Sequence, residues 1–167
     1  MSKRSAVALG VLLVTVAMLQ ICLPAGDGRL SLSPDLVPAL VFCAAVVGGS
    51  RIGTITGLAS GAVLDLAPPA DHPLGQWALV LAACGALTGA ALRVEHHPLW
   101  NLAGAAVIGV VAQLLFTGVG LALGDLHART DETVQAIPNA TVWTVCTALV
   151  LFPLTRRMIR PAVEAVR

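Results

Sequence analysis

Six apolar stretches dominate the sequence, and the basic residues between them fall mainly in every second connection. The stretches cover residues 5–24, 35–50, 52–66, 74–92, 99–123 and 138–155. Eight of the ten Lys and Arg residues lie at the termini or in the connections after the second and fourth stretches: Lys3, Arg4, Arg51, Arg93, Arg156, Arg157, Arg160 and Arg167. Only Arg29 and Arg129 lie in the other three connections. Because the cytoplasmic loops of membrane proteins carry an excess of Lys and Arg, this alternation predicts six transmembrane helices with both termini in the cytoplasm.

Composition agrees with a membrane protein and indicates no polyanionic partner. The chain is 57% hydrophobic and 11% charged, against roughly 25% charged residues in a soluble domain. The net charge is +1, so a nucleic-acid partner is not expected. The connections are too short for a second domain. We therefore predict an all-α integral membrane protein in which residues 1–167 form one polytopic domain.

A signal peptide is the alternative interpretation of the first stretch, but no Ala-x-Ala-like site follows it, and we expect an uncleaved helix.

The second and third stretches are short and closely joined. Each has about 15 residues, or roughly 22 Å of helix, against a hydrocarbon core of about 30 Å. Gly48-Gly49-Ser50-Arg51 between them is typical of a tight turn. The pair is therefore predicted to form a short helical hairpin, packed inside the bundle or in a locally thinned bilayer.

Glycines at every fourth position mark the third stretch. Gly53, Gly57 and Gly61 form a flat stripe along one helix face, and Gly85-x-x-x-Gly89 repeats the spacing in the fourth stretch. Small residues let helix backbones approach closely, which favours helix association in lipid. Ordinary packing within the bundle is one interpretation of the stripe, and a contact with a partner protein is the other.

Two acidic residues lie close to the predicted hydrocarbon region. Asp35 follows Ser33-Pro34, a sequence typical of a helix start with a cap, a first-position proline and an acid in the first turn. Asp65 instead ends its helix, where the helix dipole disfavours an anion. Either Asp65 is solvated at the interface, or it binds a neighbouring loop, a cation or a partner protein.

No motif in the sequence indicates an enzyme or a bound cofactor. The chain has no His-Glu-x-x-His, no phosphate-binding loop and no cluster with metal-ligand spacing. Its four cysteines lack Cys-x-x-Cys spacing. No stretch has a charge near its middle, where ion-coupled transporters place one. A membrane scaffold or a substrate-binding membrane module remains.

Three segments resemble the rod shape-determining MreD family. Ser33-Pro34-Asp35-Leu36 is similar to the family's Pro-Asp-Leu helix entry. Gly57-Leu58 and Gly61 to Asp65 resemble its Gly-Phe-x-x-Gly-Leu-x-x-Asp signature, with Leu58 in place of the aromatic and Ala62 in place of the leucine. Leu74-Gly75 with Leu79 resembles the Leu-Gly-x-x-x-Leu entry to the fourth helix. The resemblance covers about residues 33–89, and the rest of the chain matches in hydropathy.

The resemblance implies a non-enzymatic scaffold of the cell-elongation machinery in the bacterial cytoplasmic membrane. Such a protein would bind MreC and help regulate a RodA-type peptidoglycan polymerase with its class B penicillin-binding partner, in line with MreB filaments. Its fold would be similar to that of the substrate-binding components of energy-coupling factor transporters. That fold also supplies the alternative, a substrate-binding component of a vitamin-type importer, although a chain without Tyr and with three Phe and three Trp offers little for a polar pocket. The candidates for helix packing or a partner interface are Pro34, Asp35, Gly53, Gly57, Gly61, Asp65 and Gly75.

Overall fold

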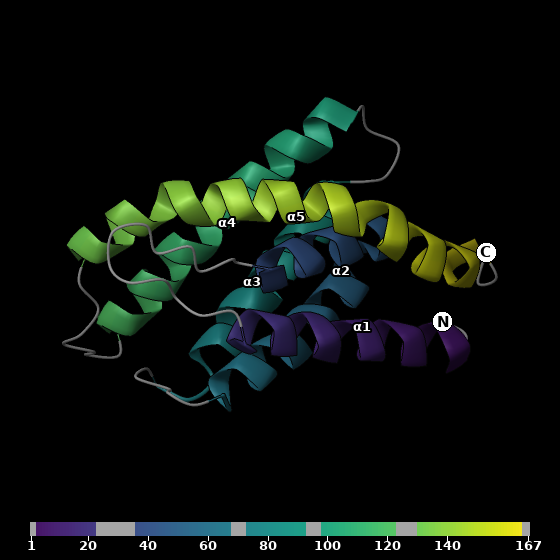
Figure 1. Cartoon of the computed structure of the whole chain (residues 1–167), viewed down its shortest axis with the longest axis horizontal. Coiled ribbons are helices and arrows are strands. Elements are labelled where there is room, and N and C mark those ends of the chain that lie inside the picture. The colour runs from purple at the N-terminus through teal and green to yellow at the C-terminus, as the bar shows by residue number, and fades with distance from the viewer. Residues whose placement is uncertain (1–2, 23–35, 68–72, 93–97, 123–129, 165–167) are drawn as a thin grey trace.

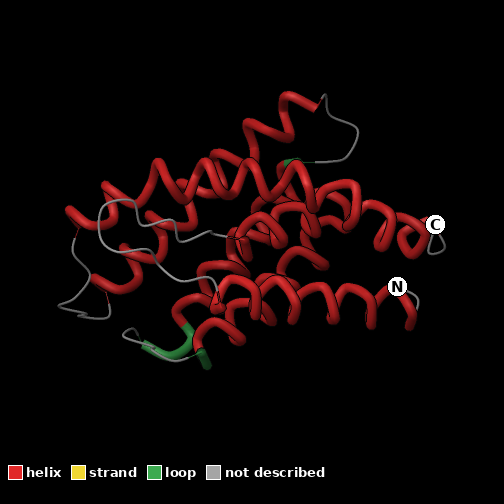
Figure 2. Tube along the Cα trace, in the orientation of Figure 1, coloured by secondary structure: helices red, strands yellow, loops and turns green. Residues whose placement is uncertain are grey.

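A broken helix lies at the centre of the molecule, and four other helices surround it (Figure 1). The structure is a computed structural model that describes residues 3–22, 36–67, 73–92, 98–122 and 130–164. Within these ranges all regular structure is helical, as Figure 2 shows, which confirms the all-α class. The helices are α1 (Lys3–Cys22), α2 (Leu36–Asp65), α3 (Gln76–Ala91), α4 (Pro98–Ala122) and α5 (Thr130–Glu164).

The first half of α2 forms the core. Every residue from Leu36 to Val46 is buried, including the large side chains of Leu40 and Phe42. A helix that is apolar on all sides must be covered on all sides, and α2 accordingly contacts each of the other four helices. Its sequence therefore explains why it occupies the centre.

Gly49 breaks α2 into two arms, residues 36–48 and 50–65. Its φ of 80° and ψ of 179° are far from helical values, and only glycine adopts such a φ without steric cost. A Cβ placed on Gly53 would lie 2.6 Å from the Cβ of Ala45. In a continuous helix residues eight positions apart are separated by about 12 Å. The arms therefore fold back against each other as a hairpin, and the second and third predicted segments correspond to the two arms of α2. With α2 taken as one broken element, the described residues form five helices.

The last helix is longer than the sequence predicted. We expected it at residues 138–155, with Pro138 at its start and Pro153 near its end, but α5 runs from Thr130 to Glu164. The additional first turns, residues 130–137, are rich in polar residues in the sequence. The hydropathy of the chain reports only the apolar part of this helix.

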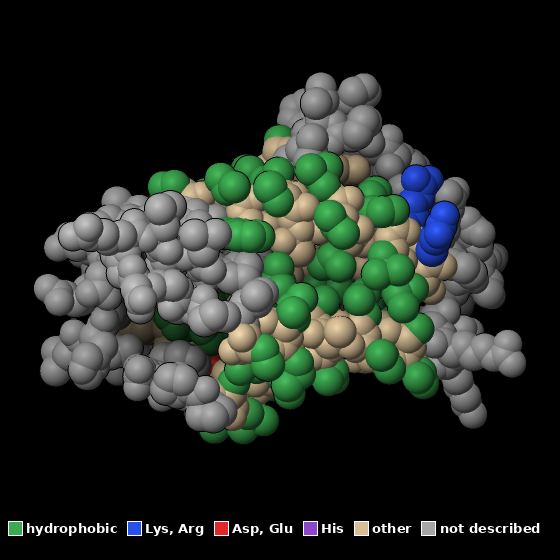
Figure 3. Space-filling view, in the orientation of Figure 1, with side chains coloured by type: hydrophobic (Ala, Val, Ile, Leu, Met, Phe, Trp, Pro, Cys, Tyr) green, Lys and Arg blue, Asp and Glu red, His purple; other side chains and the backbone are tan. Residues whose placement is uncertain are grey.

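Three helical segments are long and apolar enough to cross a membrane: Leu36–Asp65, Ala103–Ala122 and Ala140–Ile159. Val7–Cys22 and Gln76–Ala91 are shorter apolar helices. Large apolar side chains are exposed on all five helices, as in Val11, Leu58, Leu87, Leu114 and Leu149, and they cover much of the described surface in Figure 3. These features identify a candidate multi-pass membrane protein.

The beginning of α1 and the end of α5 lie at the same end of the long axis (Figure 1). Leu9 of α1 and Ile159 of α5 pack in one buried cluster there. An even number of passages along the long axis is needed to bring both helix ends to one side.

Candidate functional site

The glycines singled out in the sequence lie in the contact between the second arm of α2 and α3. A Cβ on Gly57 would lie 2.5 Å from the carbonyl carbon of Leu81 and 2.8 Å from the amide nitrogen of Ala82. A Cβ on Gly61 would lie 2.5 Å from the amide nitrogen of Ala78. All three distances are too short for a real Cβ atom. Backbone therefore meets backbone along this contact, which we call the α2–α3 seam.

The seam continues toward the Gly49 break with glycines on both helices. A Cβ on Gly53 would clash with the carbonyl oxygen of Gly85, and a Cβ on Gly85 would lie 2.5 Å from the carbonyl carbon of Gly53. A Cβ on Gly89 would lie 2.6 Å from the Cα of Ser50. Each step of about one turn forward on α2 is matched by about one turn back on α3, so the two helices pack antiparallel.

The polar side chains near the seam are satisfied within their own helix. Ser60 donates a hydrogen bond of 2.7 Å to the carbonyl oxygen of Thr56, and Thr54 donates one of 2.8 Å to that of Ser50. Small hydroxyl residues that bond the preceding turn can be buried without a partner on the facing helix. The seam therefore consists of close van der Waals contact.

Asp65 ends the seam and caps α3. Its two carboxylate oxygens accept hydrogen bonds from the backbone N–H groups of Trp77 and Ala78, each at 3.0 Å. These are the second and third residues of α3, whose N–H groups have no partner inside the helix. The cap position itself is held by Gly75, which has no side chain to perform this function. An acid from the preceding helix thus replaces the missing N-cap, and the positive end of the α3 dipole faces its charge.

Burial of Asp65 decides between its two sequence-based interpretations. The residue is 3% exposed, so an interfacial, solvated carboxylate is wrong. The other interpretation, a bond to a neighbouring segment, describes the structure. Among the remaining candidates, Gly75 has a φ of 92°, whereas Pro34 and Asp35 lie outside the described residues.

Polar side chains that the sequence analysis missed hold the same end of the bundle. Gln20 of α1 accepts a hydrogen bond of 2.8 Å from the N–H of Val37 in the first turn of α2. The amide nitrogen of Gln76 donates one of 2.6 Å to the carbonyl oxygen of Phe116 in α4. Two helix starts, α2 and α3, are thus each capped by a side chain from the preceding helix. The signal for this role was a Gln or Asp at the edge of an otherwise apolar stretch.

The side chain of Gln76 joins α3 to α4, but one of its two polar atoms has no hydrogen-bond partner among the described residues. It is 2% exposed, and its Oε1 atom has no hydrogen-bond partner within the described part of the chain. Beside it, the rings of Trp77 and Phe116 stack with centroids 4.3 Å apart and an interplanar angle of 25°. Ring stacking and one strong hydrogen bond therefore fix α4 against the capped end of α3.

This arrangement holds helices together. The carboxylate of Asp65 is occupied by two N–H donors. Among the residues that the structure describes, no group of three His, Cys, Asp or Glu side chains could hold a metal ion.

Comparisons of the chain with protein-family models, curated proteins and solved structures found no match.

Proposed function

We propose that the chain is a non-enzymatic membrane scaffold of the MreD type, with both termini in the cytoplasm, that binds an MreC-like protein. In this role it helps regulate peptidoglycan synthesis by a RodA-type polymerase and its class B penicillin-binding partner, in alignment with MreB filaments. The observation that supports the proposal is that Gly57, Gly61 and Asp65, which carry the resemblance, all act in one rigid feature. The two glycines form the seam and Asp65 caps the helix packed against them.

A scaffold requires a surface of fixed shape, and the seam supplies rigidity. Helix backbones in contact over about three successive turns cannot slide without clashes, because each glycine faces main-chain atoms rather than a flexible side chain. The cap fixes where α3 begins relative to the end of α2. The outer faces of the helices, with exposed side chains such as Ile55 and Leu79, are then held in a constant arrangement for lipid or a partner.

The topology in this proposal combines the charge pattern with the helix arrangement. With the two arms of α2 counted separately, six passages lead from α1 to α5. Arg51, Arg156 and Arg157 belong to the basic side of the sequence, which the positive-inside rule assigns to the cytoplasm. Asp65 and Gln20 then lie toward the opposite side of the bacterial cytoplasmic membrane.

The proposal is tested by co-expressing the chain with an MreC-like protein and measuring how much of that protein co-purifies in detergent. Gly57→Leu introduces a branched side chain into backbone contact and should reduce both membrane accumulation and recovery of the partner. Gly118→Leu is the matched control, because no atom lies within 4 Å of a Cβ at Gly118. If Gly57→Leu recovers as much of the partner as the wild type does, the proposed role of the seam is wrong. If the wild type recovers none, the proposed partner is wrong.

A further inference from the structure

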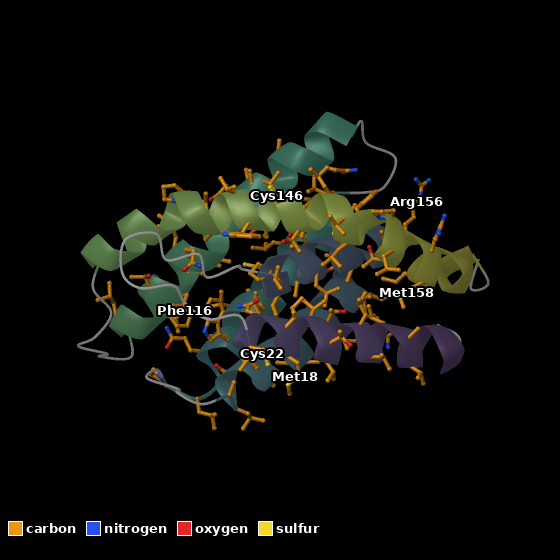
Figure 4. All side chains as sticks on the ribbon, viewed as in Figure 1. Met18, Cys22, Phe116, Cys146, Arg156 and Met158 are labelled. Carbon is orange, nitrogen blue, oxygen red and sulfur yellow. The ribbon has the colours of Figure 1, made fainter. Side chains whose placement is uncertain are left out.

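A second cluster of apolar side chains joins three helices at the end of the molecule opposite the Asp65 cap. Leu9 of α1, Ala44 of α2 and Ile159 of α5 are buried together. Val47, Ile52 and Met158 pack against them and are partly buried. In Figure 4, Met158 and Arg156 lie toward one end of the long axis and Phe116 toward the other. This cluster, which we call the terminal cluster, is therefore distant from the Asp65 cap.

Three arginines border the terminal cluster. Arg51 is exposed and directly precedes Ile52 at the turn of α2. On α5, Arg156 is half-buried, Arg157 is exposed, and both precede Met158. Figure 3 shows Lys and Arg side chains gathered at this end of the described surface.

No acid neutralises these arginines within the part of the chain whose side chains are described. The acidic residue in that part is Asp65, which ends the arm of α2 that Arg51 begins. Arg51 and Asp65 are separated along that arm by about 21 Å at 1.5 Å per residue. This exceeds the Debye length of about 8 Å at physiological ionic strength, so salt screens their attraction. The carboxylate of Asp65 is also bound to the start of α3. By sequence, the termini and connections on this side hold eight Lys and Arg residues against two acids, Glu95 and Glu164, so this side has a net positive charge.

The length of α5 places two of the arginines at the membrane surface. Its apolar span, Ala140–Ile159, has 20 residues, and at 1.5 Å per residue it covers about 30 Å, the thickness of the hydrocarbon core. Arg156 and Arg157 lie in the last turn of this span. Long basic side chains at such positions extend their charged groups to the level of the lipid phosphates.

We propose that this end of the bundle binds an anionic phospholipid. The guanidinium groups of Arg51, Arg156 and Arg157 would hold the headgroup phosphate, whose negative charge is not offset by a headgroup cation, since guanidinium forms paired hydrogen bonds with phosphate oxygens. The acyl chains would lie along the exposed apolar side chains of α1 and α5, such as Val7 and Leu154. This inference does not depend on the proposed function.

The strength of the preference follows from the number of basic residues. Each Lys or Arg near an anionic membrane surface strengthens binding about fivefold, and three together correspond to roughly a hundredfold preference over a zwitterionic lipid at low salt. Screening by salt reduces the effect. We therefore expect at least a roughly tenfold preference at physiological ionic strength.

The test measures lipid binding by the full-length protein in detergent micelles, by native mass spectrometry. The probes are phosphatidylglycerol, phosphatidylcholine of the same acyl chains and, separately, inorganic phosphate. We expect phosphatidylglycerol to bind at least tenfold more tightly than phosphatidylcholine. The triple variant Arg51→Gln, Arg156→Gln, Arg157→Gln should lose this preference. The control variant Arg129→Gln should retain it, because it removes a charge from a connection that the charge pattern assigns to the other side of the membrane.

Three results would overturn the inference. One is equal binding of the two lipids, and another is a preference that survives in the triple variant. The third is inorganic phosphate competing with phosphatidylglycerol at equal concentration, which would show an anion site rather than a lipid site. If the triple variant does not yield a monodisperse protein, the exposed single change Arg157→Gln decides the question, with an expected loss of roughly fivefold at low salt.

Discussion

The seam makes a strong prediction for Gly57→Ala, the addition of a single methyl group. The new Cβ would lie 2.5 Å from the carbonyl carbon of Leu81 and 2.8 Å from the nitrogen of Ala82. Carbon atoms in favourable contact are about 3.5–4.0 Å apart, so α2 and α3 must separate by roughly 1 Å at this point. Because both contacts are main-chain atoms, no side-chain rotation can relieve the clash.

The magnitude follows from two opposing effects. Overpacking a close contact costs about 1–3 kcal/mol, and we take the upper part of this range because separation at Gly57 also loosens the neighbouring contacts of Gly53 and Gly61. Replacing a helical glycine by alanine stabilises the helix by up to about 1 kcal/mol. The net expectation is a loss of about 2 kcal/mol in the free energy of unfolding.

Gly118→Ala is the matched control. Gly118 is also in a helix, and nothing lies within 4 Å of a Cβ placed there. Only the helix effect remains, a gain of about 0.5–1 kcal/mol. The two variants make the same chemical change and should therefore differ by about 3 kcal/mol.

The assay is reversible unfolding by SDS in mixed micelles, followed by tryptophan fluorescence. The stacking of Trp77 on Phe116 makes this signal sensitive to separation of α3 from α4. If Gly57→Ala unfolds at the same SDS fraction as Gly118→Ala or at a higher one, the backbone contact described for the seam is wrong.

Five further substitutions, at four positions, should alter the same free energy of unfolding. Asp65→Ala leaves two buried N–H groups without an acceptor and should cost about 3 kcal/mol, whereas Asp65→Asn keeps one acceptor oxygen and should cost about half as much. Gly75→Ala should cost about 1–2 kcal/mol, although space is open there, because the φ of 92° is unfavourable for a residue with a Cβ. Gln20→Ala removes the side-chain acceptor for Val37 and should cost about 1 kcal/mol. Gln76→Leu should cost less than about 1 kcal/mol, because it removes an unpaired Oε1 together with the hydrogen bond; a cost as large as that of Asp65→Ala would show that Oε1 has a partner.

The apolar helices were predictable because polar residues bound them on both sides. The predicted stretch 74–92 corresponds to α3, Gln76–Ala91, and the stretch 99–123 to α4, Pro98–Ala122. The polar start of α5 was not predicted, because residues 130–137 can be helical without being apolar. Hydropathy identifies the part of a helix that prefers lipid and does not identify its ends.

The glycine stripe indicated close packing but not its partner. Periodicity places Gly53, Gly57 and Gly61 on one face, yet which helix fills that face depends on the register between α2 and α3. For the same reason the sequence left the partner of Asp65 open, since the cap requires the end of one helix to meet the start of the next. It also depends on Gly75, whose backbone conformation leaves α3 without a side-chain cap of its own. Such tertiary hydrogen bonds cannot be inferred from a single sequence.

The central claim, that the chain is a scaffold of the cell-elongation machinery, is tested most directly by purifying it from its native membrane in mild detergent and identifying the co-purifying proteins by mass spectrometry. The proposed function predicts recovery of an MreC-like protein together with a RodA-type polymerase. Recovery of two ATPases and a transmembrane coupling subunit would contradict it and would assign the chain to an importer instead.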